Sequence, residues 1–272
     1  MMRAEEGCPL CGGPASGETA EERQAWLTAL RRRLGIVRLQ PDMLVSVVVP
    51  VYNEEATIDE ILRRITDSPV NKEVLVVNDG SNDGTSAKLQ RWNDHPGVRV
   101  LEHPCNRGKG AALRTAFAEV RGDVVIIQDA DLEYDPSEYS ALLQPIVDGE
   151  ADVVYGSRFV SEGPHRVLYF WHYVANRFIT TLSNMFTDLN LTDVETCHKA
   201  FRREVIEAIR DTLKENRFGI EIELTAKVAK RGYRIFETGV RYYGRTYQQG
   251  KKIGFRDALR ALWCIVRYRF RD

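Results

Sequence analysis

The chain has 272 residues, of which 43% are hydrophobic and 28% are charged. This composition is typical of a globular protein, and the length allows one large domain or two small ones. The formal net charge of -1 argues against a dedicated nucleic-acid-binding protein. The charge is uneven, however, because residues 241–272 contain nine Lys or Arg and only two Asp, which makes the C-terminal segment basic.

Cysteine content and apolar patterning indicate where the protein works. The chain has five cysteines, an odd number, which favours a reducing cytoplasm over a disulfide scaffold. Residues 1–13 lack the apolar stretch of a signal peptide. Every apolar run is interrupted before the roughly 18 residues that a membrane span requires. We therefore expect a cytoplasmic protein, either soluble or held peripherally at the cytoplasmic face of a membrane.

Residues 1–43 are predicted to be an appendage to the main domain. A stretch rich in Gly, Pro and Cys comes first, and a helical pattern over residues 18–34 ends before Pro41. Cys8 and Cys11 form a Cys-x-x-Cys pair, which is half of a zinc knuckle. A structural zinc site needs four ligands, and no second such pair follows. A flexible tail and a zinc site completed by dimerisation are the two alternatives.

From Val45 onward, short apolar runs alternate with amphipathic segments, which predicts βαβ units and a mainly parallel sheet. The predicted strands are residues 45–49, 73–77, 98–101, 124–127 and 153–155. The predicted helices are residues 54–65, 85–92, 109–120 and 136–147. After Gly156 longer helical patterns predominate, with one late strand near residues 233–243. The fold class is therefore α/β, with a nucleotide-binding half followed by a more helical half.

The residues that follow the predicted strands are unusually polar, and ligands of open α/β sheets bind at the carboxyl ends of parallel strands. The fourth strand leads into Asp129 and Asp131. If the strand continued, both carboxylates would project to the same side. Such a pair suits Mg²⁺ or Mn²⁺, which also binds substrate phosphates. An isolated Asp-x-Asp is more often a solvated turn, but three other polar strand ends favour a metal site here.

Two further strand ends carry candidate binding residues. Asp79 follows the second strand and precedes Gly80, so it could bind a nucleobase or ribose, or simply form a turn. Gly108-Lys109-Gly110 opens a predicted helix, where backbone N–H groups and a cation could meet a phosphate. The chain has neither a Walker loop nor a G-x-G-x-x-G motif after the first strand, so these common phosphate-binding loops are excluded.

Five motifs, in order along the chain, resemble those of family 2 glycosyltransferases with a GT-A fold. They are Pro50-Val51-Tyr52-Asn53-Glu54, Asn78-Asp79-Gly80-Ser81, Asn106-Arg107-Gly108-Lys109-Gly110, Asp129-Ala130-Asp131-Leu132-Glu133 and Gly156-Ser157-Arg158-Phe159. Within the family, the chain is most similar to dolichol-phosphate mannose synthases and bacterial polyprenyl-phosphate glycosyltransferases over about residues 45–270. The resemblance implies a GT-A domain over residues 44–250, with a mainly parallel nucleotide-binding sheet flanked by helices and a more helical acceptor half.

The resemblance also implies sugar transfer with inversion from a UDP- or GDP-sugar, with Mg²⁺ or Mn²⁺ as cofactor. By position, the donor-binding residues would be Pro50, Tyr52, Glu54, Asp79, Lys109, Asp129, Ala130 and Asp131. The first three would line the nucleoside pocket, Asp79 would meet the base or ribose, and Lys109 would lie in the ribose and diphosphate region. Asp129 and Asp131 would be the metal ligands, with Asp131 also catalytic and Glu133 a further polar residue near the metal.

On the acceptor side, the resemblance places Arg158 opposite an acceptor phosphate and Asp193 near the reacting sugar. Arg245 and Lys251 resemble a late basic loop that can close over the donor diphosphate or the acceptor phosphate. A phosphate acceptor is already anionic and needs little help from a base, whereas a hydroxyl needs one. Asp193 would therefore be the catalytic base for a hydroxyl acceptor and would have a positional role with a lipid phosphate.

One part of the pattern departs from the polyprenyl-phosphate enzymes. These usually carry an arginine and a serine eight and four residues before an asparagine on the helix after the Gly-Ser-Arg motif. Counting back from Asn176, this chain has Leu168 and His172. Arg166 or His172 would have to compensate.

Residues 251–272 are predicted to form a basic amphipathic helix. Its apolar residues are Phe255, Ala258, Leu259, Leu262, Trp263, Val266 and Phe270, and arginines lie on another face. A helix at a membrane interface and a terminal helix packed on its own domain fit this pattern equally. The aromatic segment at residues 167–185 raises the same question.

Three functional hypotheses follow. The first is sugar transfer to a polyprenyl phosphate at a membrane surface, and the second is transfer to a hydroxyl of a saccharide or other soluble acceptor. The third is a nucleotide-sugar-binding protein without catalysis, which the intact Asp129, Asp131 and Asp193 argue against. The expected partners are a nucleotide-sugar donor, a polyprenyl-phosphate acceptor and peripheral membrane contact, without nucleic acid.

Overall fold

The computed structural model describes residues 42–160, 166, 167, 169–245 and 255–271, with the backbone alone at 255 and 256, and the single residues Thr19 and Trp26. The chain divides into two compact units, Met1–Arg38 and Leu39–Asp272. Cys8, Cys11 and Lys251 lie outside the described residues, as does nearly all of the predicted appendage.

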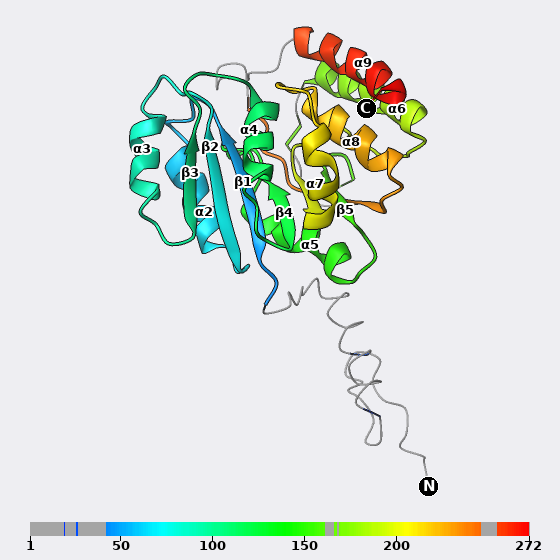
Figure 1. Ribbon diagram of the computed structural model, residues 1–272. Coiled ribbons are helices and arrows are strands. Elements are labelled where there is room, and N and C mark those ends of the chain that lie inside the picture. Colours follow the sequence, from blue (N-terminus) through cyan, green and yellow to red (C-terminus); the bar gives the residue numbers. More distant parts are fainter. Residues whose placement is uncertain are drawn as a thin grey trace. The chain divides into compact units, whose positions relative to one another are not determined.

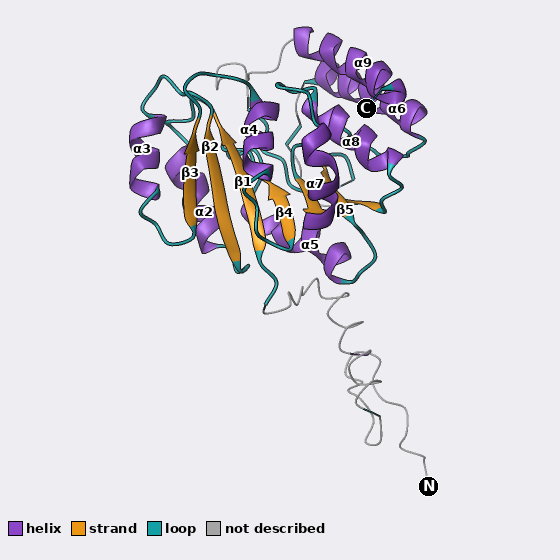
Figure 2. Cartoon of the chain, viewed as in Figure 1, coloured by secondary structure: helices purple, strands orange, loops and turns teal. Residues whose placement is uncertain are grey.

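A seven-stranded sheet forms the centre of the second unit, in the order β3-β2-β1-β4-β6-β5-β7 (Figures 1 and 2). The strands are β1 (Val45–Val51), β2 (Lys72–Asn78), β3 (Val98–Glu102), β4 (Val124–Ile127), β5 (Val153–Ser157), β6 (Lys199–Arg202) and β7 (Ile235–Gly239). Every pairing is parallel except those of β6, which runs antiparallel between β4 and β5. The predicted mainly parallel α/β sheet is confirmed, and β6 is an addition to it.

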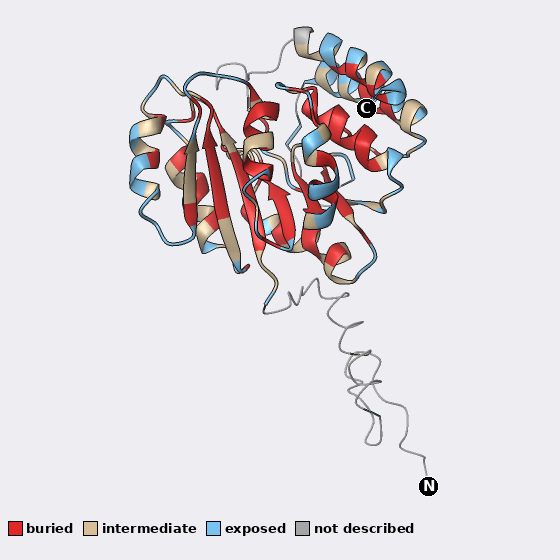
Figure 3. Ribbon diagram, viewed as in Figure 1, coloured by how far each residue is buried: buried red, intermediate tan, exposed pale blue. Residues whose placement is uncertain are grey.

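Helices cover both faces of this sheet. They are α2 (Ile58–Asp67), α3 (Thr85–Trp92), α4 (Lys109–Phe117), α5 (Tyr139–Val147), α6 (Phe170–Thr187), α7 (Arg203–Ile209), α8 (Ile220–Lys230) and α9 (Phe255–Phe270), with short 3-10 turns at Pro136–Glu138 and Arg210–Thr212. Side chains of a strand point alternately to the two faces, so Val48 packs in the layer of α4, α7 and α8, whereas Val47 and Val49 pack in the layer of α2, α3 and α5. The strands in the middle of the sheet, β2, β1, β4, β6 and β5, are mostly buried, whereas the edge strands β3 and β7 are mostly half-buried (Figure 3).

The helix predicted at residues 54–65 begins four residues later, at Ile58. The residues before this helix instead form hydrogen bonds with residues 83–85, which follow β2. The backbone N–H of Glu54 donates to Thr85 Oγ1 at 2.9 Å, and that of Glu55 donates to Asp83 Oδ2 at 3.2 Å. These contacts fix the carboxyl ends of β1 and β2 relative to each other.

The C-terminal helix α9 packs on α6 and α8, beside which it lies in Figure 1. Its buried face consists of Ala261, Cys264, Ile265 and Tyr268. A second apolar row along the same helix stays exposed and consists of Leu259, Trp263, Val266 and Phe270. The helix is therefore packed on its own domain and still presents an apolar row to solvent. Among the described residues, no helix is both long enough and apolar enough to cross a membrane.

Candidate active site

A cleft of about 890 Å³ opens at the carboxyl ends of β1 and β4, the position at which open α/β sheets bind ligands. Its volume lies in the range of small-molecule sites. The residues that line it are Asn53, Glu54, Glu55, Ala56, Thr57, Asp83, Lys88, Asp131, Leu132, Arg166, Tyr243 and Arg245. Of the residues predicted from sequence, Glu54, Asp131 and Arg245 meet here.

The acidic pair lies in a turn and not on a strand, because β4 ends at Ile127, two residues before Asp129. The strand does not continue through the pair, so strand alternation does not set the directions of the two carboxylates. Asp129 points to the ammonium of Lys109, whose Nζ lies 2.7 Å from Oδ1. Burial is the strongest single influence and would raise the pKa of Asp129, but the charge of Lys109 and a hydrogen bond with Cys197 act together against it and hold the pKa below its usual value.

Asp131 has the opposite electrostatic environment. Burial, followed by the charges of Asp129 and Glu133, raises the pKa of Asp131 to about 8. Repulsion of this kind is relieved by a cation between the carboxylates. Among the described residues, no three His, Cys, Asp or Glu are grouped to hold a metal. A carboxylate pair suits an ion that takes its other ligands from substrate phosphates and water, as Mg²⁺ commonly does.

Arg245 closes one side of the cleft. Its guanidinium bonds Glu54 at 2.7 and 3.2 Å and donates twice to the carbonyl oxygen of Asp131, at 2.7 and 3.0 Å. Its backbone N–H donates to Glu133 Oε1 at 2.6 Å, and Tyr242 Oη donates to the other oxygen of Glu133 at 2.8 Å. The loop with Tyr242 and Arg245 is thus hydrogen-bonded both to Glu54, after β1, and to the acidic turn of residues 129–133, after β4.

Asp79 does not line the cleft. Its carboxylate is 2% exposed and lies 2.6 Å from His103 Nδ1, and it accepts hydrogen bonds from the backbone N–H groups of Arg107 and Gly108. Gly108 has φ 95°, and a Cβ there would collide with the carbonyl oxygen of Asn216, so only glycine fits. Asp79 therefore holds the loop that leads into α4, and the sequence-based expectation of a base or ribose contact has no support in this geometry.

The remaining donor-side predictions fall around the cleft without lining it. Pro50 lies in β1 and Tyr52 directly follows it, both half-buried. Ala130 is buried in the core beneath the acidic turn. Lys109 is 9% exposed and contacts Asp129 and Glu221, so it acts on the acidic turn from the interior and not from the cleft.

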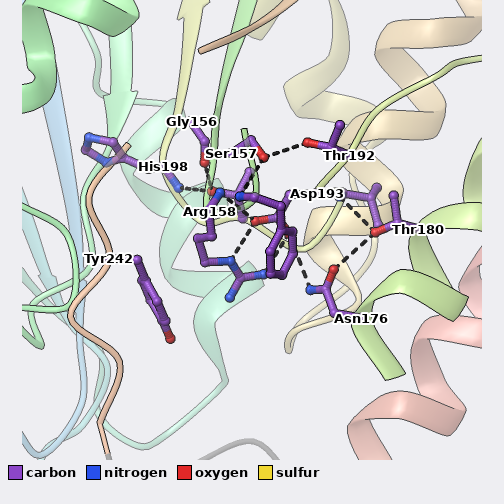
Figure 4. A network of polar contacts seen from close by, with 12 residues as sticks. Gly156, Ser157, Arg158, Asn176, Thr180, Thr192, Asp193, His198 and Tyr242 are labelled. Atoms are coloured by element: carbon purple, nitrogen blue, oxygen red, sulfur yellow. Dashed lines mark hydrogen bonds and ion pairs between the residues drawn. The ribbon is translucent and has the colours of Figure 1, made fainter. Parts of the chain in front are cut away.

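Arg158 and Asp193 form a second polar centre, beyond Tyr242 (Figure 4). Nε and Nη2 of the arginine donate to the two oxygens of Asp193 at 2.6 and 2.7 Å, and the guanidinium lies over the Tyr242 ring at 5.2 Å. Asp193 is fully buried and also accepts from the backbone N–H of Arg158 and from Asn176 Nδ2. Burial would raise the pKa of Asp193, but Arg158 keeps it low.

The candidate compensating residues lie before helix α6, in the case of Arg166, and on it, in the case of His172. Arg166 lines the cleft and donates to the carbonyl oxygen of Gly244 at 2.7 Å. His172 packs beside the Tyr169 ring. Leu168 lies outside the described residues. Arg166 is therefore the better placed of the two compensating candidates.

Sequence reasoning missed several residues of the site. Asn53, Glu55, Asp83, Lys88 and Tyr243 line the cleft. Of these, Asn53 lies within one of the five motifs. Its backbone is left-handed (φ 52°), a conformation that asparagine adopts more readily than most residues. The cleft is lined by five segments that lie far apart along the chain, so local patterns could not have assembled it.

A mainly parallel sheet with an acidic turn after its fourth strand, a cleft at the strand ends and an arginine-carboxylate centre nearby defines a GT-A glycosyltransferase architecture. The fold is that of solved glucosyl-3-phosphoglycerate synthase from Mycobacterium tuberculosis in complex with Mn²⁺, UDP and phosphoglyceric acid. The TM-score is 0.66 at 21% identity, over 85% of this chain and 80% of that one.

The sequence profile described as "Glycosyl transferase family 2" matches residues 46–210, which is more than half of the chain. The chain belongs to this family. It is 30% identical to the undecaprenyl-phosphate mannosyltransferase of Micrococcus luteus, over 78% of this chain and 88% of that protein. It is 29% identical to the dolichol-phosphate mannosyltransferase of Pyrococcus furiosus over 78% of this chain, which spans only 61% of that protein's length.

Proposed function

We propose that the protein is an inverting glycosyltransferase that moves a sugar from a UDP- or GDP-sugar to a polyprenyl phosphate. Relatives named for transfer to undecaprenyl and dolichol phosphate support the acceptor class. The observation that carries the proposal is the state of Asp193, whose carboxylate is buried and bound by Arg158. A carboxylate held in this way is a poor general base, so the acceptor that fits best is one that needs no base.

The donor would bind in the cleft, with its nucleoside near Glu54 and its diphosphate near Asp131 and Arg245. Asp129 and Asp131 would hold Mg²⁺ or Mn²⁺, which supplies positive charge to stabilise the leaving diphosphate. Lys109 keeps Asp129 ionised and oriented for that purpose. In the transfer, a phosphate oxygen of the acceptor forms a bond to the anomeric carbon while the bond from that carbon to the diphosphate oxygen breaks, and no proton has to move.

The acceptor phosphate would bind at Arg158. Asp193 takes the Nε and Nη2 edge of the guanidinium, and among the described residues no hydrogen bond is made by Nη1. Arginine has five N–H donors in a planar fork, so the unused edge can bind phosphate while the other stays fixed. Arg166, in the cleft, adds a second cation in place of the arginine that the polyprenyl-phosphate enzymes usually carry.

The lipid chain of the acceptor would leave the site along α6. Asn176 of this helix contacts Asp193, and the helix exposes Phe170, Trp171 and Phe178 by 65%, 75% and 59%. Helix α9 packs beside it and exposes its own row with Trp263 between two arginine side chains. Exposed aromatic side chains with adjacent arginines suit the interface of an anionic membrane, so we propose peripheral attachment through these two helices.

The test is sugar transfer by the full chain with Mn²⁺, a panel of UDP- and GDP-sugars, and undecaprenyl phosphate in vesicles. We expect nucleotide release together with sugar that partitions into organic solvent as a mild-acid-labile phosphodiester. Arg158→Lys keeps the charge but loses the paired edges, and should lower kcat/KM for the acceptor by about a hundredfold, equivalent to roughly 2.7 kcal/mol. A matched control is Arg91→Lys, at an exposed position of α3.

The alternatives give different results. If soluble saccharides support faster nucleotide release than undecaprenyl phosphate does, the acceptor is a hydroxyl and Asp193 must be released from Arg158 during turnover. If no donor is cleaved with any acceptor although a nucleotide binds, the protein is a nucleotide-sugar-binding protein. Retention of full turnover by Asp131→Ala would reject the proposed metal and donor site.

A further inference from the structure

Four charged side chains form a continuous buried line behind the site. Lys109 Nζ lies 2.7 Å from Asp129 Oδ1 and 3.2 Å from Glu221 Oε1. The other oxygen of Glu221 lies 2.5 Å from Lys199 Nζ. The side chains of Lys109, Glu221 and Lys199 are only 9%, 4% and 0% exposed. The charges alternate along the line, and Glu221, on α8, is the member that both lysines share.

The far end of this line reaches the acceptor centre. Lys199 Nζ donates to the carbonyl oxygen of Val194 at 3.2 Å and to that of Thr196. These carbonyls belong to the segment that begins with Asp193, the partner of Arg158. The ammonium also lies 4.7 Å from the centre of the Tyr155 ring. The line therefore connects the acidic turn after β4 with the segment that fixes Arg158.

Fold stability alone gives little reason for such an arrangement. Removing charges from water is costly, and well-packed apolar side chains of similar volume often stabilise a core as well or better. An ion pair does fix direction, however, because each carboxylate oxygen has a defined partner. Glu221 uses one oxygen for each lysine, so a single side chain holds both ammonium groups in place, each on its own side.

We propose that Glu221 is a positioning residue that sets Asp129 and the segment of residues 193–196 at a fixed separation. It acts on Asp129 through Lys109 and on the carbonyls of Val194 and Thr196 through Lys199. The donor diphosphate and the acceptor phosphate are thereby aligned across the anomeric carbon. This inference rests on the proposed function, since that function assigns Asp129 to the metal and Arg158 to the acceptor.

The test compares Glu221→Gln with Glu223→Gln. Glu223 is a matched control because it lies on the same helix and is fully buried, but it accepts from the backbone N–H groups of Lys214 and Glu215 and faces Lys227. Two readouts are measured: the rise in Tm caused by Mn²⁺ with UDP or GDP, and KM for undecaprenyl phosphate. We expect Glu221→Gln to remove most of the Tm rise and to raise KM about tenfold, because supporting partners of metal ligands typically matter to this extent.

Glu223→Gln should lower the Tm of the free protein but keep both readouts within about twofold of the wild type. If Glu221→Gln gives the same pattern as Glu223→Gln, the positioning role is rejected. A wild-type protein that binds nucleotide with Mn²⁺ but transfers nothing would reject the proposed function, and the Tm readout would still test the link between Glu221 and Asp129.

Two further variants keep the test decisive if Glu221→Gln does not fold. Lys109→Gln should diminish the Tm rise from Mn²⁺ and nucleotide and leave acceptor KM within about twofold. Lys199→Gln should do the reverse, raising acceptor KM about tenfold while the Tm rise persists. General destabilisation cannot produce opposite patterns in two buried lysines, so equal effects of both variants on both readouts would also overturn the proposal.

Discussion

Asp131 should make metal binding steeply dependent on pH. Burial and the charges of Asp129 and Glu133 raise the pKa of Asp131 to about 8. A carboxyl group with this pKa is about half ionised at pH 8 and about 1% ionised at pH 6. Because a divalent cation must displace the proton, its apparent affinity should fall about fifty-fold between pH 8 and pH 6, which is roughly 2.3 kcal/mol. The affinity is lost as pH falls, since the protonated form of Asp131 is the one that cannot bind.

The assay is titration with Mn²⁺ at several pH values and constant ionic strength, with the free ion measured by electron paramagnetic resonance. Glu133→Gln removes one of the charges that raise the pKa of Asp131, so the pH dependence should move to lower pH. Glu119→Gln, whose side chain is 49% exposed on the surface, should leave it unchanged. A wild-type affinity that changes less than about threefold across this interval would refute the electrostatic reasoning.

Three further predictions concern other parts of the molecule. Burial raises the pKa of Glu195 to about 7, so above this pH its carboxylate is anionic and competes for the positive charge of Arg158. The KM for the acceptor should therefore rise severalfold from about pH 6 to pH 8, and Glu195→Gln should abolish that rise. Gly108→Ala should reduce the free energy of unfolding in urea by about 2 kcal/mol, because φ is 95° and Asn216 blocks the Cβ; a loss below about 0.5 kcal/mol would contradict this. The double variant Trp171→Ser, Phe178→Ser should weaken binding to phosphatidylglycerol vesicles at least about tenfold, since burying each exposed ring in the membrane contributes about 2 kcal/mol. The Tm rise with Mn²⁺ and UDP or GDP should persist in this variant. Unchanged vesicle binding would mean that another surface meets the membrane.

The parts of the fold that local pattern could predict are those with a clear apolar period. The strand at residues 124–127 and the helix at residues 85–92 have the predicted bounds. Strand β6 was missed because it has only four residues and carries Lys199 and Arg202 at its ends. It is a strand because β4 and β5 pair with it on both sides, which is a tertiary effect that no local pattern contains.

The sequence predicted which residues belong to the site more accurately than it predicted where their side chains point. The motifs brought Glu54, Asp131 and Arg245 to one cleft. Asp79 and Lys109 were expected at the donor but turn inward, because their partners are His103 and Asp129, at least 20 positions away along the chain. The direction of a polar side chain depends on which partner the fold supplies, and that information appears only when the segments are assembled.

The pairing of charges in the site predicts that nucleotide binding requires the cation. The two cations assigned to the donor side, Lys109 and Arg245, are each already paired, with Asp129 and Glu54. A diphosphate that entered alone would therefore meet the carboxylates of the acidic turn without a free ammonium or guanidinium from these two residues to offset them, and buried like charges repel strongly. We expect EDTA to lower the affinity for UDP and GDP at least about tenfold in calorimetric titrations, because a divalent ion bridges carboxylates and phosphates. Equal affinity with and without the ion would show instead that Arg245 leaves Glu54 and neutralises the diphosphate by itself.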